Sequence, residues 1–294
     1  MMELYIPRRV MTLFLLIDSS GSMSTNGNMG KVNGAIEEMI PLLRDVSDEQ
    51  SDAEIKLAVL EFSSGCKWVT GDNGPVSLDD YDWNDMTAGG LTDMGAAFRE
   101  LESKLSRNAF MNNAAGNYAP VIILLTDGEP TDDYRSGLKI LQHNNWFRHA
   151  VRVAISVDSG ANDVLAEFTG SSETVLRYNS QKSDLKKLLT RLAVVSSTIQ
   201  SRSQVVEIPD QKDEKKDADK KDADKKDDGT DNKAAQEIID IIRKEEEERK
   251  KAEKAQKEAE KKAKEKKEAD KKDDGKKDDG KQDDDLDNVW KIDW

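Results

Sequence analysis

Over the first 200 residues, short apolar runs alternate with longer segments whose apolar residues recur every three or four positions. The short runs predict buried strands and the longer segments predict amphipathic helices, because the two structures have different periods. Strands that alternate with helices favour an α/β fold, with a doubly wound, mostly parallel sheet and helices on both faces. The clearest predicted strands are residues 10–18, 54–62, 121–126 and 150–157, and the clearest predicted helices are 30–47, 92–105, 131–144 and 183–195.

Two of the predicted helices contain residues that bear on where they begin and end. Pro41 lies inside the helix at 30–47, and we expect a kink or an early end there, because proline lacks the backbone N–H that a helix interior needs. Thr131 is expected to cap the third helix. Asp132 and Asp133 would then interact favourably with the N-terminal dipole of that same helix.

The composition changes sharply near residue 200. Charged residues make up about two-thirds of the chain beyond this point, so that part cannot build a core of its own. We therefore expect a globular domain at 1–200, followed by a charged disordered linker at 201–232, a single charged helix at 233–272 and a disordered acidic tail at 273–294. Glu–Lys pairs four residues apart support the helix. A coiled coil is the less favoured alternative, because its seam would be mostly alanine.

Side chains with oxygen atoms follow two of the predicted strands and open one of the predicted helices. Asp18, Ser20 and Ser22 come at the end of the first strand, Asp127 follows the third, and Thr92 begins the second helix. Because ligands bind open parallel sheets at the carboxyl ends of the strands, these side chains can meet at one edge. Their oxygens are hard donors that suit Mg²⁺ or Mn²⁺. The residues after the first strand are also consistent with a serine-rich turn whose aspartate caps the next helix.

Together, these five residues resemble the metal-ion-dependent adhesion site (MIDAS) of von Willebrand factor A (VWA) domains. The resemblance covers about residues 8–200. Two further segments, 126–133 and 146–155, are similar to the bacterial TerY type of this family, named for tellurium-resistance gene clusters.

The resemblance implies how each residue acts on the metal. Ser20, Ser22 and Thr92 would bind the cation directly, and Asp18 and Asp127 would act mostly through water. Neutral hydroxyls leave the charge of the cation poorly neutralised, so a carboxylate from a protein partner can bind strongly at the open position.

The function that follows from the resemblance is a non-enzymatic, Mg²⁺-dependent protein-interaction module. The TerY likeness implies an adaptor or scaffold in a bacterial stress or chemical-defence system, with phosphatase- or kinase-like partners. Asp93, next to Thr92, adds a carboxylate near the cation. We assign Asp93 to the helix N-terminus instead of to the metal, because a negative charge is stabilising there.

Two other functions stay open. One is a metal-dependent phosphohydrolase, which would need a nucleophile or a metal-activated water. Against it, Ser20 stands two residues after Asp18, where a second aspartate would be needed, and the sequence lacks a Gly-x-x-x-x-Gly-Lys-Ser/Thr phosphate loop. The other is an adaptor subunit for a ring ATPase.

Charge and cysteine content limit which classes of partner and which cellular compartment we expect for the protein. A net charge of −14 at pH 7 argues against nucleic acid as a partner. No apolar run approaches the ~20 residues that a membrane helix needs, so we expect no membrane association. The single cysteine, Cys66, allows no disulfide within the chain, which fits the reducing cytoplasm.

Two groups of apolar residues stand out from the charged extension. Four isoleucines between 238 and 242 form a patch that could dock on the domain or on a partner. Trp290 and Trp294 lie in an acidic context near the end of the sequence. Since a disordered spacer has no internal use for tryptophan, we interpret them as a short motif that docks on a separate protein.

Overall fold

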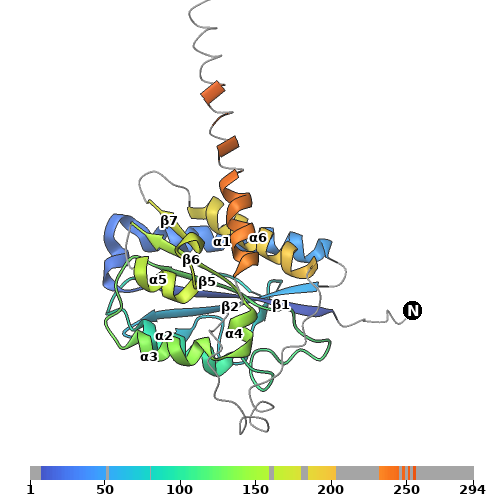
Figure 1. Ribbon diagram of the computed structural model, residues 1–294, viewed down its shortest axis with the longest axis horizontal. Helices are drawn as coiled ribbons and strands as arrows, with labels where there is room; N and C mark the ends of the chain where they lie inside the picture. The colour runs from blue at the N-terminus through green and yellow to red at the C-terminus, as the bar shows by residue number, and fades with distance from the viewer. Residues whose placement is uncertain are drawn as a thin grey trace, which may run out of the picture. The chain divides into compact units, whose positions relative to one another are not determined.

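Figure 1 shows the computed structural model of the chain. The structure describes residues 8–50, 53–79, 81–158, 162–179, 185–202 and 232–244, together with 247–248, 251 and 254–255. The chain divides into two compact units, Met1–Ile242 and Arg243–Trp294. Almost all of the second unit lies outside the described residues, so the fold below is that of the first unit.

Seven strands form a single sheet in the described part of the chain. Their order is β3-β2-β1-β5-β6-β7, and β4 also pairs with β2. The pairs among β1, β2, β5, β6 and β7 are parallel, whereas β3 and β4 run antiparallel to β2. The strands are β1 (Arg9–Asp18), β2 (Ala53–Ser63), β3 (Gly65–Trp68), β4 (Val76–Ser77), β5 (Val121–Thr126), β6 (Val151–Val157) and β7 (Val175–Tyr178).

Helices cover both faces of this sheet (Figure 1). In β1, Leu13 and Leu15 belong to the apolar cluster of α1 and α6, whereas Phe14 and Leu16 belong to that of α2 to α5. The alternation shows that side chains of β1 are buried on both faces of the sheet. Together with the strand pairing, it confirms the predicted α/β fold with a mixed, mostly parallel sheet. The helices are α1 (Asn28–Glu49), α2 (Met94–Lys104), α3 (Tyr134–Gln142), α4 (Asn145–His149), α5 (Asn162–Thr169) and α6 (Leu185–Arg202), with short 3₁₀ turns at Gly21–Gly27 and Ser172–Thr174.

Pro41 does not end α1, which continues to Glu49, so the expected early end is wrong. Both Pro41 and Glu37, one turn before it, lie on the exposed side of the helix. Water can therefore hydrate the carbonyl that loses its partner to proline, and the apolar side of α1 keeps its packing.

The isoleucine patch docks on the domain, one of the two alternatives that the sequence left open. Residues 233–244 are helical, and the first unit includes this helix up to Ile242. Asn232 fixes its start: the side-chain Nδ2 donates to the carbonyl of Arg152 at 2.6 Å, and Oδ1 accepts from the N–H of Arg152 at 3.2 Å. The compact unit therefore extends past the boundary expected at residue 200. The buried side chains of the helix at 233–244 are Ala235, Ile238, Ile239 and Ile242, and they belong to the apolar cluster of α1 and α6.

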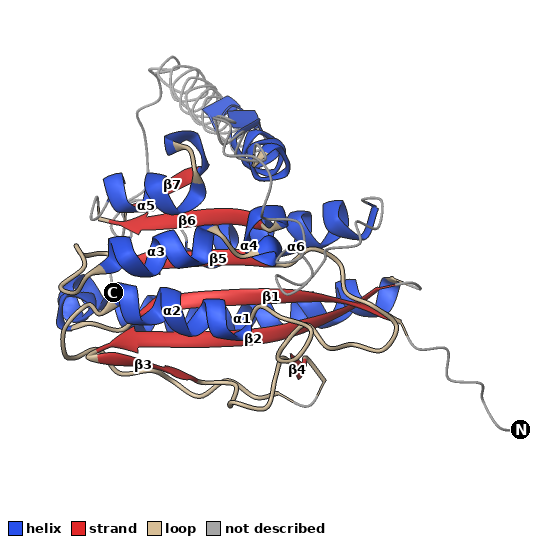
Figure 2. Cartoon of the chain, turned by 60° about the horizontal axis from the view of Figure 1, so that its bottom comes forward, coloured by secondary structure: helices blue, strands red, loops and turns tan. Residues whose placement is uncertain are grey.

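The parallel strands all point toward the same edge of the sheet, as the arrowheads of β2 and β6 show (Figure 2). Turns and helix starts that follow these strands therefore gather at that edge. Within the described residues, no helix is both long enough and apolar enough to cross a membrane.

Candidate metal centre

Strand β1 delivers the carboxylate of Asp18 to the carboxyl edge of the sheet. Asp18 is fully buried, and its Oδ1 accepts a hydrogen bond from the backbone N–H of Ser20 at 2.8 Å. Its Oδ2 accepts from the hydroxyl of Thr126, the last residue of the neighbouring strand β5. Thr126 thus orients Asp18, a role that sequence reasoning missed. The sequence signal for it was a hydroxyl at the end of a predicted buried strand.

Ser20, Ser22 and Asp127 form a connected row of oxygen atoms across two strand ends. The Oγ atoms of Ser20 and Ser22 are 3.0 Å apart. The hydroxyl of Ser22 donates to Oδ1 of Asp127 at 2.6 Å. Ser20 is buried and Ser22 is exposed, so the row leads from the interior to the solvent. The structure therefore brings these three predicted residues together.

Thr92 lies in the same region, because its hydroxyl and that of Ser22 are both close to Gly128. A side chain at Gly128 would begin 3.4 Å from the Ser22 hydroxyl and 3.8 Å from the Thr92 hydroxyl, so both hydroxyls face this glycine. The N–H of Thr92 donates to the hydroxyl of Thr131 at 2.9 Å, which fixes the turn before α2.

The turn that follows β1 is held against the turn that precedes Thr92. The N–H of Gly89 donates to the carbonyl of Ser19 at 2.8 Å, and the N–H of Gly21 donates to the carbonyl of Gly90 at 3.1 Å. Gly90 has a φ of +84°, and a side chain there would begin 2.7 Å from the Ser64 hydroxyl, so the turn requires glycine.

Ser19, between the candidate ligands, faces away from them. Its hydroxyl donates to Oε1 of the buried residue Glu61 at 2.7 Å, and Lys67 pairs with Glu61 Oε2 at 3.1 Å. This contact anchors the turn on β2, and sequence reasoning missed Glu61 because nothing in its local pattern marks it.

The acidic residues near α2 and α3 differ in role from the sequence expectation. Asp133, and not Thr131, is the N-cap of α3, where its side chain accepts from the N–H of Ser136. Asp132 instead accepts from the N–H groups of Gly95 and Ala96, both at 2.8 Å, and so caps α2. The expectation that Asp132 serves α3 is wrong, because the two helix starts lie side by side.

Asp93 stands at the N-cap position of α2 as expected, but its side chain makes no cap hydrogen bond there. Its Oδ2 accepts from the N–H of Gly65 at 2.8 Å, where the turn after β2 enters β3. Asp93 therefore ties that turn to the loop that carries Thr92.

Burial raises the pKa of both carboxyl groups of the site. For Asp18, hydrogen bonds from Thr126 and Ser20 oppose the effect of burial on the pKa. For Asp127, burial raises the pKa, the hydrogen bond from Ser22 opposes it, and the charge of Asp158 adds to it. Burial makes the ionised forms of both carboxylates unfavourable, and a cation bound nearby would stabilise those forms. This edge of the sheet therefore favours a cation.

The donor set fits a hard divalent cation. In the part of the chain that the structure describes, no group of three or more histidine, cysteine, aspartate or glutamate side chains could hold a metal ion. A cation at this edge would therefore depend on hydroxyl oxygens together with Asp18 and Asp127, a set that suits Mg²⁺ or Mn²⁺.

Leu91, next to Thr92, is 57 % exposed, whereas most large apolar side chains of the described residues are buried. Its N–H donates to the Ser64 hydroxyl at 3.1 Å, which fixes its backbone at the edge of the site. The other predicted contact residues, Trp290 and Trp294, lie outside the described residues.

Comparison with known proteins gave both structural and family matches. Proximal thread matrix protein 1 from the mussel byssus is 19 % identical, with a TM-score of 0.46, over 64 % of this chain and 49 % of its own. The pilus adhesin SpaC from Lactobacillus rhamnosus GG is 12 % identical, with a TM-score of 0.47, over 64 % of this chain and 31 % of its own. The matched region thus spans half or less of either protein. The mussel protein has also been solved with a zinc-occupied MIDAS motif, at 18 % identity, a TM-score of 0.42, and coverage of 64 % and 46 %.

None of the curated proteins compared with the chain matches it. The model of the von Willebrand factor type A domain family matches residues 12–191, which is more than half of the chain. The chain therefore belongs to this family, whose domains mediate protein–protein interactions and are generally not catalytic.

Proposed function

We propose that the chain binds Mg²⁺ or Mn²⁺ at the carboxyl edge of its sheet and uses the metal to bind an acidic residue of a protein partner. The observation that carries this proposal is the row of Ser20, Ser22 and Asp127 oxygens, joined at 3.0 and 2.6 Å across two strand ends. Ser22 is exposed, so a partner can approach the row from solvent.

Each residue has a distinct part in the proposed site. The hydroxyls of Ser20, Ser22 and Thr92 would hold the metal, while Asp18 and Asp127 would supply negative charge through water. When bound, the metal supplies a positive charge and a position for an oxygen ligand from the partner. Thr126 holds Asp18 in place, so it acts through that residue and not on the metal.

A metal is needed for an acidic partner because the chain itself is strongly acidic. With a net charge of −14, the protein repels carboxylates at long range. A divalent cation among neutral hydroxyls reverses the potential locally, which makes partner binding conditional on the metal. Leu91 would add an apolar contact beside the metal, so the preferred partner presents its acidic residue next to an apolar one.

We further propose that this interaction serves an adaptor in a bacterial stress or chemical-defence system. The support is the likeness of residues 126–133 and 146–155 to the TerY type, which is an argument from resemblance and not from site chemistry. In that setting the partners would include phosphatase- or kinase-like proteins.

Metal binding is tested by calorimetric titration of the full chain with Mg²⁺, Mn²⁺ and Zn²⁺. The Ser20→Ala/Ser22→Ala variant should lose binding, whereas Ser24→Ala should keep it. Ser24 lies in the same turn, but its hydroxyl donates to the carbonyl of Gly21 at 2.7 Å and not to the row. Equal affinity in all three proteins would contradict the proposed ligands.

Partner binding is tested by capture from the native cell with Mg²⁺ and with a chelator. The proteins captured by the wild type in Mg²⁺ should be absent with chelator and absent for Ser20→Ala/Ser22→Ala. The Leu91→Ala variant should bind Mg²⁺ normally and capture less of the same proteins. An identical set of captured proteins in every condition would contradict a metal-gated adaptor.

A further inference from the structure

The proposed metal centre takes its ligands from three separate turns, so its geometry depends on how these turns are held together. Ser20 and Ser22 lie in the turn after β1, Thr92 lies just before α2, and Asp127 follows β5. The hydrogen bond between Ser22 and Asp127 uses oxygen atoms of the site itself, so it changes when a metal binds. Contacts that do not use these oxygens must therefore fix the geometry of the metal-bound site.

Thr131 holds the backbone of Thr92. The N–H of Thr92 donates to the hydroxyl oxygen of Thr131 at 2.9 Å, and the N–H of Thr131 donates to the carbonyl of Thr92 at 2.9 Å. Both backbone polar groups of Thr92 are thus bonded to one residue, and the Thr92 hydroxyl takes no part in these bonds. Because Thr131 follows soon after Asp127 in the sequence, the two bonds join the turn of Thr92 to the turn of Asp127.

Asp132 and Asp93 extend this connection. The two carboxylate oxygens of Asp132 accept from the N–H groups of Gly95 and Ala96, each at 2.8 Å. The hydroxyl of Thr131 donates to Oδ1 of Asp93 at 3.3 Å. The segment that follows β5 and the first turn of α2 are therefore joined by side-chain and backbone hydrogen bonds together.

We propose that Thr131 and Asp132 are positioning residues that fix Thr92 relative to the other ligands, and that this rigidity makes the site prefer Mg²⁺ to Ca²⁺. The proposal rests on the proposed function, because it takes Thr92 as a metal ligand. Mg²⁺ demands near-octahedral geometry at about 2.0–2.1 Å, whereas Ca²⁺ accepts flexible sites at about 2.3–2.6 Å. A site whose turns are fixed discriminates between the two cations, and a site in which Thr92 can move discriminates less.

Two substitutions at Thr131 and one at Asp132 test this role. Thr131→Val changes the shape little but removes both hydrogen bonds of the hydroxyl, whereas Thr131→Ser keeps the hydroxyl. Residue 131 is exposed, so both variants should fold. Asp132→Asn is an independent variant, because its single amide oxygen can replace only one of the two acceptors for Gly95 and Ala96.

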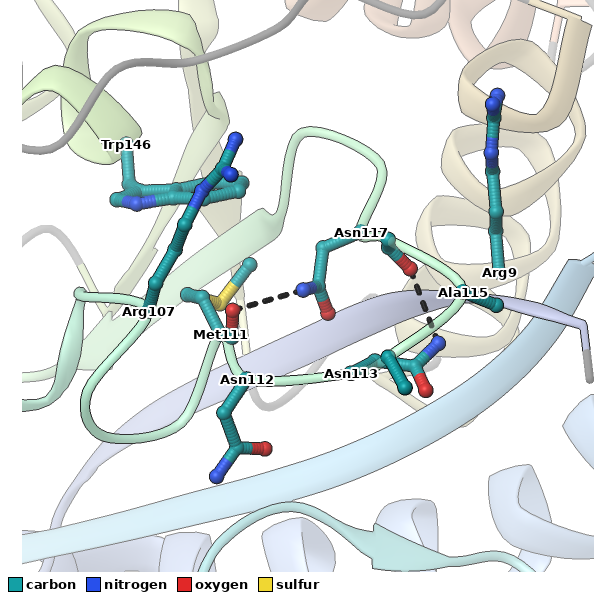
Figure 3. Close-up of a pocket in the computed structure, with 10 residues that line it drawn as sticks. Arg9, Arg107, Met111, Asn112, Asn113, Ala115, Asn117 and Trp146 are labelled. Carbon is teal, nitrogen blue, oxygen red and sulfur yellow. Dashed lines mark hydrogen bonds between the residues drawn. The ribbon is translucent and has the colours of Figure 1, made fainter.

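The matched control is Asn113→Ala, in the loop at 112–117 that Figure 3 shows. Nδ2 of Asn113 donates to the carbonyls of Arg8 and Gly116, both at 3.0 Å. The control thus loses two side-chain hydrogen bonds that hold a loop, as Thr131→Val does. This loop lies beside the start of β1, and the ten-residue strand places it about 30 Å from the metal centre. Asn113→Ala should therefore lower thermal stability without changing metal affinity.

The measurement is calorimetric titration of the full chain with Mg²⁺ and with Ca²⁺, together with the Tm of each variant in chelator. We expect Thr131→Val to bind Mg²⁺ about tenfold more weakly, as expected for the loss of these hydrogen bonds, and to bind Ca²⁺ nearly as the wild type does. Asp132→Asn should likewise lower the ratio of Mg²⁺ to Ca²⁺ affinity. Thr131→Ser and Asn113→Ala should keep the wild-type ratio.

The ratio of the two affinities separates positioning from general stability. The proposal is overturned if Thr131→Val and Asp132→Asn keep the wild-type ratio, or if Asn113→Ala changes the ratio as much as Thr131→Val does. Wild-type binding of Mg²⁺ with unchanged variants would overturn this proposal alone and leave the proposed function standing. A wild type that does not bind Mg²⁺ would overturn both.

Discussion

The hydroxyl of Ser22 donates a 2.6 Å hydrogen bond to Asp127, although 105 positions separate the two residues in the sequence. The contact joins the turn after β1 to the end of β5, because these parallel strands are neighbours in the sheet. A divalent cation bound here would replace this hydrogen bond: the Ser22 hydroxyl would hold the metal directly and Asp127 would act through water.

Mg²⁺ should stabilise the protein, and more strongly at neutral than at acidic pH. The pKa values of Asp18 and Asp127 are raised by burial, so without metal these groups favour the folded state less as the pH rises through their raised pKa values. A bound cation favours their ionised forms instead. At a Mg²⁺ concentration 100-fold above its Kd, the free energy of unfolding should rise by about 2.7 kcal/mol. Thermal unfolding between acidic and neutral pH, with Mg²⁺ and with chelator, measures it; a shift in Tm that shrinks toward neutral pH would contradict the site.

In the Asp18→Asn variant, the stability of the folded state should no longer depend on Mg²⁺. An asparagine keeps an oxygen that can accept from the N–H of Ser20, while the costly buried charge is removed. The metal-free variant should therefore be at least as stable as the wild type but should gain no stability from Mg²⁺. Thermal unfolding with and without Mg²⁺ checks both parts. A normal Mg²⁺ response would show that Asp18 is not part of the site.

Gly137→Ala should separate α2 from α3 and destabilise the domain. A side chain at Gly137 would begin 2.5 Å from the carbonyl oxygen of Gly95, so the helix starts must move apart. Overpacking of this kind costs about 1–3 kcal/mol. Gly34→Ala in α1 is the control, because nothing lies within 4 Å of that position. It should stabilise by about 0.5–1 kcal/mol. Urea unfolding compares the two variants, and equal effects would contradict the close approach.

Ile239→Ala should destabilise the domain although residue 239 lies far beyond the expected boundary at 200. Ile239 is fully buried in the cluster of α1 and α6, and truncation of such a side chain costs about 2–5 kcal/mol. Ile241, in the same helix, is 41 % exposed. Ile241→Ala should therefore change the free energy of unfolding by less than about 0.5 kcal/mol. Chemical denaturation measures both, and similar values would mean that the helix does not dock.

Cys66 should react slowly with thiol reagents at neutral pH. Burial, with a smaller contribution from the charge of Glu100, raises its pKa to about 11. Because the thiolate is the reactive form, the rate should rise steadily with pH up to that value. Reaction with a chromogenic disulfide across the pH range measures the rate, with the unfolded chain as the reference. A rate in the folded protein equal to that of the unfolded chain at neutral pH would contradict the shift.

The sequence by itself determined the layered fold and the identity of the clustered oxygens. The apolar run in β1 contributes side chains to both faces of the sheet. A continuous apolar run therefore predicts, from sequence alone, a strand that is buried on both faces. Asp18, Ser20, Ser22 and Asp127 come at the ends of parallel strands, which must share one edge. Chain order and periodicity are enough for both conclusions, since neither depends on how the helices pack.

Only the tertiary structure decided which partner each remaining polar or apolar group takes. Asp132 caps α2 instead of α3, Thr126 holds Asp18, and Asn232 fastens the last docked helix to Arg152. In each case the contact joins residues far apart in sequence. Local pattern fixes a residue's own element, but its neighbours depend on how close the packed helices and loops can approach.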